Sequence, residues 1–300
     1  MIRHVLDVAG LGAGALEEIC ALAGRDPAAL GRPLAGRGAA LIFEKPSNRT
    51  RHSTEMAVVQ LGGHPVYTKG DEVGLDVREP VEDVARVLAG YHAVLAARVF
   101  DHRTLVRMAD VSPVPVVNLL SDLAHPLQAV ADILTMRREF GDLRERSVCW
   151  VGDYNNVARS LAEACALQGA ALRFASPERH AADERELVRL LALGAASAEV
   201  YRDPVLAASG SCAVHTDTWT SMGQEAEAAA RREEFAGFTV DEAVMAAALP
   251  DAVFMHCLPA HRGEEVAAAV IDGPSSRVVP QAHNRLHAAR AVLAWSMGVR

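Results

Sequence analysis

Lysine is almost absent from this chain of 300 residues, which contains only Lys45 and Lys69. Arginine supplies the rest of the positive side-chain charge, so contacts to anions must come from arginine or from backbone N–H groups. No apolar run approaches the roughly 20 residues that cross a bilayer. The first residues do not predict a signal peptide, because Asp7 and Glu17 stand where an apolar core is needed. We expect a cytoplasmic protein with no membrane partner.

Cysteine is also sparse, and no two cysteines have CxxC spacing. The five are scattered along the chain: Cys20, Cys149, Cys165, Cys212 and Cys257. An odd number at such spacings favours neither a disulfide framework nor a zinc ribbon. The net charge of -8 disfavours a nucleic-acid partner, since binding to phosphates usually needs a basic excess.

Apolar runs alternate with amphipathic helical patterns along the whole chain, which is typical of α/β proteins with parallel sheets. Strands are expected at 39–43, 65–67, 93–100, 114–119, 148–151, 171–175, 213–216 and 252–256. Helices are expected at 47–61, 81–91, 103–110, 125–140, 157–168, 183–193 and 282–297. The polar stretch Gly141–Arg146 is the best domain boundary. We therefore predict two similar-sized α/β domains, each a parallel sheet flanked by helices, joined by interdomain helices, with a ligand cleft between them.

The segment Phe43–Arg51 carries the strongest functional signal. A strand runs into a short turn, and a helix is expected to begin at Ser47, which directs free N–H groups at one point and suits a phosphate. Thr50 adds a hydroxyl, and Arg49 adds a guanidinium fork. The plainer alternative is an N-cap serine beside surface arginines.

A second signal is His125-Pro-Leu-Gln128 at the start of the helix expected at 125–140. His125 and Gln128 are three residues apart, so they share a helical face and each can donate to a carbonyl. A capping histidine with a solvated glutamine remains the alternative. Arg98 ends a strand that should be buried, where a charge needs an anionic partner from the protein or from a ligand.

Polar residues also follow the strands of the second half. Asn156 comes after the strand at 148–151, and Asp217 with Ser221 lies in the string Asp217-Thr-Trp-Thr-Ser-Met-Gly. Carboxylate, hydroxyl and amide groups of this kind suit a zwitterionic amino acid, although an Asx-turn in a polar loop is an alternative. The string from Gly152 to Asn156 lacks the later glycines of a dinucleotide fingerprint, which disfavours a NAD-type oxidoreductase.

The last string, His256-Cys-Leu-Pro-Ala-His261, follows a strand, and Cys257 is expected to head a turn that opens a helix. Two histidines and a cysteine are compatible with zinc, but a tetrahedral site needs a fourth ligand, and no residue of suitable spacing is present. We predict no metal.

Together these strings resemble the aspartate/ornithine carbamoyltransferase family. Its Ser-x-Arg-Thr-Arg motif matches Ser47–Arg51 and its His-Pro-x-Gln motif matches His125–Gln128. The strings at Asp217–Gly223 and His256–Pro259 resemble the ornithine-specific branch, and Arg285 matches a late arginine of the family.

The resemblance implies transfer of a carbamoyl group from carbamoyl phosphate to ornithine. A domain at 1–140, completed by the C-terminal helix 282–300, would bind carbamoyl phosphate, and a domain at 141–281 would bind ornithine. Four residues would take part in the chemistry: Arg98, His125, Cys257 and Asp217. Carbamoyl phosphate would contact Ser47, Asn48, Arg49, Thr50, Arg98, His125, Gln128, Cys257, Leu258 and Arg285. Ornithine would contact Asn156, Asp217, Ser221 and Met222.

The resemblance further implies no cofactor and a homotrimer, or a multiple of trimers, with active sites at subunit interfaces. In relatives a polar residue of the neighbouring subunit reaches the phosphate. The matching stretch 69–79 is longer and acidic here, so that residue is not assigned. Three alternatives remain: another amine such as putrescine or an acylated ornithine, an oxidoreductase, and a silent paralogue that only binds a partner.

Overall fold

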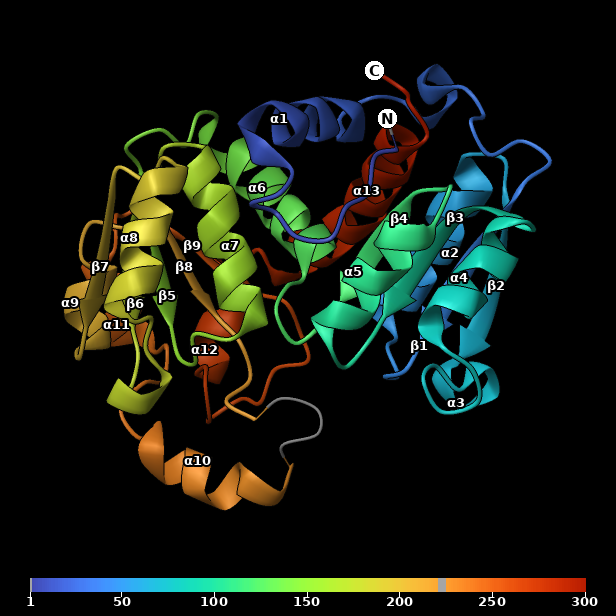
Figure 1. Cartoon of the computed structure of the whole chain (residues 1–300). Helices are drawn as coiled ribbons and strands as arrows, with labels where there is room; N and C mark the ends of the chain where they lie inside the picture. The colour runs from blue at the N-terminus through green and yellow to red at the C-terminus, as the bar shows by residue number, and fades with distance from the viewer. Residues whose placement is uncertain (1, 221–224) are drawn as a thin grey trace. The chain divides into compact units, whose positions relative to one another are not determined.

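The computed structural model describes residues 2–220 and 225–300, and the chain divides into two compact units (Figure 1). Unit 1 comprises Met1–Leu134 and His283–Arg300, and unit 2 comprises Thr135–Ala282. The divisions fall inside two helices, α6 (Pro126–Phe140) and α13 (Val278–Ser296), which therefore link the units covalently. The first division lies six residues before the boundary expected from the polar stretch that follows residue 140.

Unit 1 contains a four-stranded parallel sheet in the order β2-β1-β3-β4. Its strands are β1 (Gly38–Phe43), β2 (His64–Lys69), β3 (His92–Arg98) and β4 (Val116–Leu120). Its helices, besides parts of α6 and α13, are α1 (Gly12–Ala23), α2 (Arg49–Gln60), α3 (Gly70–Val73), α4 (Val81–Ala89) and α5 (His102–Val111), with a 3-10 turn at Pro27–Leu30.

Alternation along β1 sends its side chains to opposite faces of the sheet. Ala40 and Ile42 pack with Val84 of α4 and Leu105 of α5 in one buried cluster, so α4 and α5 cover the same face. The part of the C-terminal helix α13 from His283 onward belongs to this unit by its contacts. In it, Trp295 Nε1 donates to Glu18 Oε2 of α1 at 2.7 Å.

Unit 2 contains a five-stranded parallel sheet in the order β7-β6-β5-β8-β9. Its strands are β5 (Ser147–Val151), β6 (Ala171–Ala175), β7 (Ser197–Tyr201), β8 (Ala213–Thr216) and β9 (Val253–His256). Its helices are α7 (Asn156–Leu167), α8 (Glu184–Leu193), α9 (Pro204–Ala208), α10 (Ala228–Glu234), α11 (Glu242–Ala247) and α12 (Ala268–Ile271), with 3-10 turns at Glu178–His180 and Glu225–Glu227.

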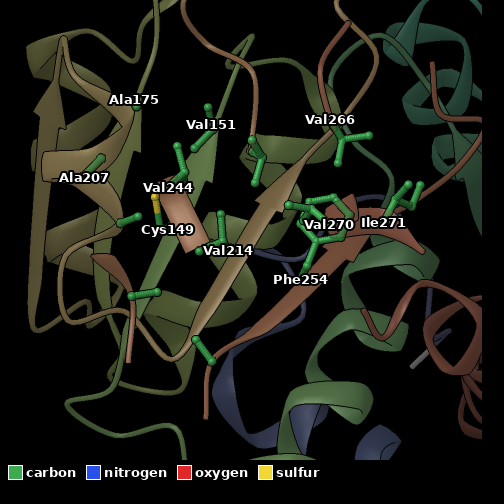
Figure 2. Packing of buried hydrophobic residues seen from close by; sticks show 14 of the residues in the cluster. Cys149, Val151, Ala175, Ala207, Val214, Val244, Phe254, Val266, Val270 and Ile271 are labelled. Atoms are coloured by element: carbon green, nitrogen blue, oxygen red, sulfur yellow. The ribbon is translucent and has the colours of Figure 1, made fainter. Parts of the chain in front are cut away.

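Figure 2 shows the core on one face of this sheet. Cys149 of β5 and Phe254 of β9 point into a cluster with Val244 of α11 and Val270 of α12, and all four side chains are buried. Burying one such apolar side chain contributes about 1.5–3 kcal/mol. Helices α7 and α8 lie together on the other face (Figure 1). This packing holds the strand ends, where the polar loops begin, in fixed positions.

The predicted fold class is confirmed: both units are parallel sheets flanked by helices. Two local expectations were wrong. Helix α2 begins at Arg49 with Asn48 as its N-cap, two residues after Ser47. Cys257 opens no helix, since the next helix after β9 is α12 at Ala268. No helix among the described residues is both long and apolar enough to cross a membrane.

Candidate active site

Each sheet has a point at which the strand order reverses, and ligands of open α/β sheets bind outside the carboxyl ends of the strands at this point. In unit 1 the point lies between β1 and β3, and in unit 2 between β5 and β8. The segment that begins at Glu44 follows β1, and Arg98 ends β3. Glu44 N donates to Arg98 O at 2.9 Å, so the two strand ends are joined directly.

The turn between β1 and α2 leaves hydrogen-bond donors available at the start of the helix. Among the described contacts, the N-cap Asn48 makes no side-chain capping hydrogen bond, and Ser47 Oγ accepts only the N–H of Thr50, at 3.3 Å. Helix α7, by contrast, is capped by the side chain of Asn155. The positive end of α2 is therefore open to an anion.

Arg285 of α13 ties this turn to the start of α6. It donates to Thr50 Oγ1 at 2.9 Å and to Gln128 Oε1 at 2.6 Å. Gln128 in turn donates to Asp132 Oδ1 at 2.7 Å. All four side chains are buried, so this network fixes the hydroxyl of Thr50 and the amide of Gln128.

His125 lies directly before α6, and its carbonyl accepts the first N–H groups of that helix. Burial, and then the charges of Arg285, Arg98 and Arg49, hold the pKa of His125 well below its usual range. The imidazole is therefore neutral at physiological pH. A neutral imidazole beside three guanidinium groups is a hydrogen-bond donor in a strongly positive field.

Lys45 adds to that field, and the sequence analysis did not assign it to the site. Burial, followed by the charge of Arg98, lowers the pKa of Lys45. Its ammonium lies 4.5 Å from the centre of the Phe100 ring. The sequence signal that could have identified Lys45 is its position two residues before Ser47. Among the described residues Arg49 takes part in no ion pair, which leaves its charge for a ligand.

In unit 2, Asp217 follows β8 and Cys257 follows β9. Cys257 Sγ donates to Asp217 Oδ1 at 3.0 Å, and the N–H of Thr218 donates to the same oxygen at 2.8 Å. Asn155 Nδ2 donates to Asp217 Oδ2 at 3.0 Å. The structure thus brings a thiol and a carboxylate, far apart in sequence, into one hydrogen-bonded pair.

The loop after β9 is held by side chains instead of helical hydrogen bonds, which explains why no helix begins at Cys257. Leu258 N donates to His256 Nδ1 at 2.9 Å, and His261 N donates to Glu265 Oε1 at 2.5 Å. Leu258 has a positive φ of 61° and precedes a cis Pro259. The left-handed backbone of Leu258 is not helical.

A possible metal-binding group consists of Asp217, His256 and Cys257, whose candidate ligand atoms lie within 4.8 Å of one another. Both ring nitrogens of His256 are engaged, however. Nδ1 accepts from Leu258 N, and Nε2 lies 3.2 Å from Glu265 Oε1. A second group, His261 with Glu264 and Glu265, shares that same buried carboxylate. These side chains are hydrogen-bonded to one another, so they do not form an open set of metal ligands.

The predicted residues fall into two sets, each within one unit. Unit 1 brings together Ser47, Asn48, Arg49, Thr50, Arg98, His125, Gln128 and Arg285. Unit 2 holds Cys257, Leu258, Asp217 and Asn156, of which Asn156 is the first residue of α7. The predicted residues Ser221 and Met222 lie outside the described part of the chain. Asn155, which the sequence analysis passed over in favour of its neighbour, makes the contact to Asp217.

Unit 1 thus carries an open helix N-terminus beside a neutral imidazole, and unit 2 carries a thiol–carboxylate pair, an arrangement that suits a group-transfer enzyme. Comparison with known proteins specifies the group. The carbamoyl-P binding domain model of aspartate/ornithine carbamoyltransferases matches residues 3–138, and their Asp/Orn binding domain model matches residues 144–296. The chain belongs to the aspartate/ornithine carbamoyltransferase family and is a carbamoyltransferase.

Individual relatives agree over nearly the full length. The chain is 48% identical to an ornithine carbamoyltransferase of Thermus thermophilus over 97% of this chain and 95% of the relative. It is 46% identical to an anabolic ornithine carbamoyltransferase of Pyrococcus furiosus over 90% and 87% of the two chains. The solved structure of the ornithine carbamoyltransferase from Pyrococcus furiosus superposes with a TM-score of 0.92 at 42% identity, covering 99% of this chain and 97% of that one.

Proposed function

We propose that this carbamoyltransferase transfers the carbamoyl group of carbamoyl phosphate to the side-chain amine of L-ornithine, which yields L-citrulline and phosphate. The pair formed by Cys257 Sγ and Asp217 Oδ1, 3.0 Å apart at the carboxyl ends of β9 and β8, carries the assignment to an amine acceptor. The relatives named ornithine carbamoyltransferase support the choice of ornithine. An anabolic relative among them favours a role in arginine biosynthesis.

Unit 1 is assigned to carbamoyl phosphate. The phosphate would be bound by Ser47, Asn48, Arg49 and Thr50 at the open end of α2, because free N–H groups and a guanidinium fork both favour a dianion. Arg98 would share the phosphate and help it to leave. Arg285 contributes by holding Thr50 and Gln128 in place.

Attack on the carbamoyl carbon places negative charge on the carbonyl oxygen of a tetrahedral intermediate. That oxygen needs donors that are fixed in advance. Arg98, the neutral His125 and Thr50 are the donors we assign, and burial of all three keeps water from competing with them. Gln128 and the backbone carbonyls of Cys257 and Leu258 would orient the carbamoyl NH2 group.

Unit 2 is assigned to ornithine. Asn156 would bind the α-carboxylate, and Asp217, Ser221 and Met222 would bind the amino groups. The side-chain ammonium must lose a proton before it attacks, since a lysine-like amine has a reference pKa near 10.4. A thiol that donates to a carboxylate can pass its proton on as it accepts another. Cys257 would therefore take the ammonium proton while its own proton moves to Asp217 Oδ1.

The remaining bonds balance without a further reactant. The amine nitrogen forms a bond to the carbamoyl carbon, the C–O bond to phosphate breaks, and phosphate leaves with the electron pair. The second proton of the amine leaves the intermediate with phosphate. No metal, nucleotide or redox partner enters this scheme.

Carbamoyl transfer from carbamoyl phosphate, measured as the carbamoylated product of each amine, tests the proposal, with ornithine, putrescine, N-acetylornithine and aspartate compared at equal concentration. We expect kcat/KM for ornithine to exceed that for each other amine by at least about 100-fold, because a site with partners for both α-groups rejects putrescine and N-acetylornithine, and aspartate has no side-chain amine to attack. A preference for another amine would replace ornithine as substrate. Absence of transfer to any of them would contradict the proposed function.

The assembly we propose is a homotrimer, or a multiple of trimers, as the family resemblance implies. The edge strand β2 and the neighbouring helix α2 expose apolar side chains that a subunit interface would cover, namely Val66, Met56 and Val59. Light scattering should give three times the 32.0 kDa mass of the chain, or a multiple of that. A monomer would contradict this assignment.

We further propose a cytoplasmic location. All five cysteines are thiols and not disulfides, and four of them are buried. Thiols in such number are typical of proteins from a reducing compartment. Fractionation of the source cells, with the enzyme activity as the readout, tests this assignment.

A further inference from the structure

Asn155 uses both ends of its side-chain amide. Its Oδ1 accepts the N–H groups of Val157 at 2.9 Å and of Ala158 at 3.1 Å, which caps α7. Its Nδ2 donates to Asp217 Oδ2 at 3.0 Å. Because the two backbone donors require an acceptor, the helix itself decides which way the amide points. The NH2 group of Asn155 is thereby directed at Asp217.

The two oxygens of Asp217 consequently have different partners. Oδ1 accepts from Cys257 Sγ and from the N–H of Thr218, whereas Oδ2 accepts from Asn155. A hydrogen bond from an amide draws negative charge toward the oxygen that accepts it. Asn155 therefore holds part of the carboxylate charge on Oδ2, away from the sulfur.

The turn that carries Asn155 is anchored on both sides. Before it, the side chain of Asp153 is paired with Arg231, and the carbonyl of Asp153 accepts from Trp150 Nε1 at 2.9 Å. Beside it, the hydroxyl of Tyr154 donates to Glu186 Oε1 at 2.8 Å. Asn155 thus sits on a rigid support, as a residue that orients another group requires.

We propose that Asn155 is a positioning residue, which orients the Asp217 carboxylate and sets the charge that it presents to the Cys257 thiol. Asn155 need not touch a substrate to do so. The consequence for turnover rests on the proposed function, because that function makes Cys257 the proton acceptor. The consequence for the thiol itself does not, and it can be measured without substrates.

Other charged groups face the pair and must stay constant in the test. Asp153 lies near Asp217 and is flanked by Arg231 and His180. His256, next to Cys257, is backed by the buried carboxylate of Glu265. Substitution of Asn155 alters none of these side chains, so a change in thiol behaviour reports on Asn155.

Two variants separate the capping role of Asn155 from its contact with Asp217. Asn155→Ser and Asn155→Asp each retain an oxygen that caps helices about as well as asparagine does. Both lose the Nδ2 group that donates to Asp217 Oδ2, because a carboxylate has no proton to donate and the serine hydroxyl is one bond shorter than the amide NH2. Asn155→Asp also places a like charge beside that oxygen. Asp203→Ser is the matched control, because Asp203 caps α9 of the same unit through Val205 N and Leu206 N.

The readout is the rate at which iodoacetamide alkylates Cys257 in the full-length protein, measured against pH by peptide mass spectrometry. We expect the pH midpoint of alkylation to rise in both Asn155 variants, by about one unit or more in Asn155→Asp, since a nearby negative charge disfavours the thiolate. Asp203→Ser should match the wild-type curve. In the citrulline assay, kcat should fall about 10-fold or more, while KM for carbamoyl phosphate stays within about twofold.

Thermal melting of each variant establishes that it is folded. Unchanged or lowered alkylation midpoints in folded Asn155→Ser and Asn155→Asp overturn the inference, whatever their activity. If the wild-type protein makes no citrulline, the proposed function is contradicted. Raised midpoints in the Asn155 variants would still support the role of Asn155 at the thiol. If only one variant folds, its midpoint alone decides.

Discussion

Arg285 donates a 2.9 Å hydrogen bond to the hydroxyl of Thr50, although 235 residues separate the two in sequence. The same guanidinium donates to Gln128 at 2.6 Å. One buried side chain of the C-terminal helix thus fixes two groups that we assign to carbamoyl phosphate. The planar guanidinium group of arginine makes both contacts at once, whereas the ammonium group of a lysine is a point charge on a flexible side chain and does not.

Arg285→Lys should therefore retain the charge but lose the geometry. We expect kcat/KM for carbamoyl phosphate to fall about 10- to 100-fold, because Thr50 and Gln128 lose their shared donor and their positions loosen. Steady-state kinetics with saturating ornithine measure the effect. Arg290→Lys, on the same helix but bonded to Gln60, is the control for changes in α13 itself. Equal losses in the two variants would indicate a general effect of the helix.

Arg49→Ala should weaken carbamoyl phosphate directly. A hydrogen bond to a charged group contributes about 1.5–3 kcal/mol, which corresponds to roughly 10- to 100-fold in affinity. Calorimetric titration with carbamoyl phosphate measures the loss. Arg86→Ala removes an exposed arginine whose one ion pair among the described residues is with Asp83 of its own helix, and this variant should bind carbamoyl phosphate normally. Wild-type affinity in Arg49→Ala would remove the start of α2 from the phosphate site.

The sequence predicted the strands that are buried on both faces, because continuous apolar runs such as the one ending at Phe43 have few other interpretations. It missed β7, an edge strand in which Glu199 interrupts the apolar residues and every side chain is partly exposed. It also missed α9 and α12, which have five and four residues, too few to show a helical period.

The candidate site was predictable as a set of motifs but not as a set of contacts. The helix was expected to begin at Ser47, whereas α2 begins two residues later, at Arg49. Two adjacent asparagines are equivalent in sequence, and only the backbone geometry distinguishes Asn155, the cap of α7, from Asn156. The bond between Arg285 and Thr50 depends on tertiary packing that no local pattern contains.

Stability should fall with acid because of two buried histidines. Burial, and then the charge of His256, lowers the pKa of His215 to about 3, and burial chiefly lowers the pKa of His125. Below the unfolded-state pKa near 6.5 the unfolded chain takes up protons that the folded chain does not, so each histidine removes up to about 1.4 kcal/mol of stability per pH unit. Above that value the effect vanishes.

Urea unfolding of the ligand-free enzyme between pH 7.5 and 5.5 measures this loss, and His215→Asn should make the pH dependence shallower by the share of one histidine. His52→Asn, which removes an exposed histidine, is the control. The interpretation fails if His215→Asn and the wild type lose stability in parallel as the pH falls.

Asn156→Ala should affect the other substrate. Asn156 is the first residue of α7 and stands next to Asn155, which caps the helix and donates to Asp217 Oδ2. We expect ornithine binding to weaken about 10-fold while carbamoyl phosphate binding remains near the wild-type value. Separate calorimetric titrations with the two ligands decide the matter, and the opposite pattern would move Asn156 out of the ornithine site.

Cys257 provides the last prediction, which concerns pH. If ornithine must lose a proton to react, kcat/KM rises with pH and then levels off. Cys257→Ser should lower turnover, because a hydroxyl gives up its proton to Asp217 less readily than a thiol does. The variant should still bind carbamoyl phosphate, since the backbone carbonyl assigned to the carbamoyl group survives. Cys257→Ala tests the plainer view that Cys257 only fills space, in which case the melting temperature alone would change. An Ala variant with full turnover and an unchanged pH profile would mean that the proton passes to Asp217 or to phosphate without the sulfur.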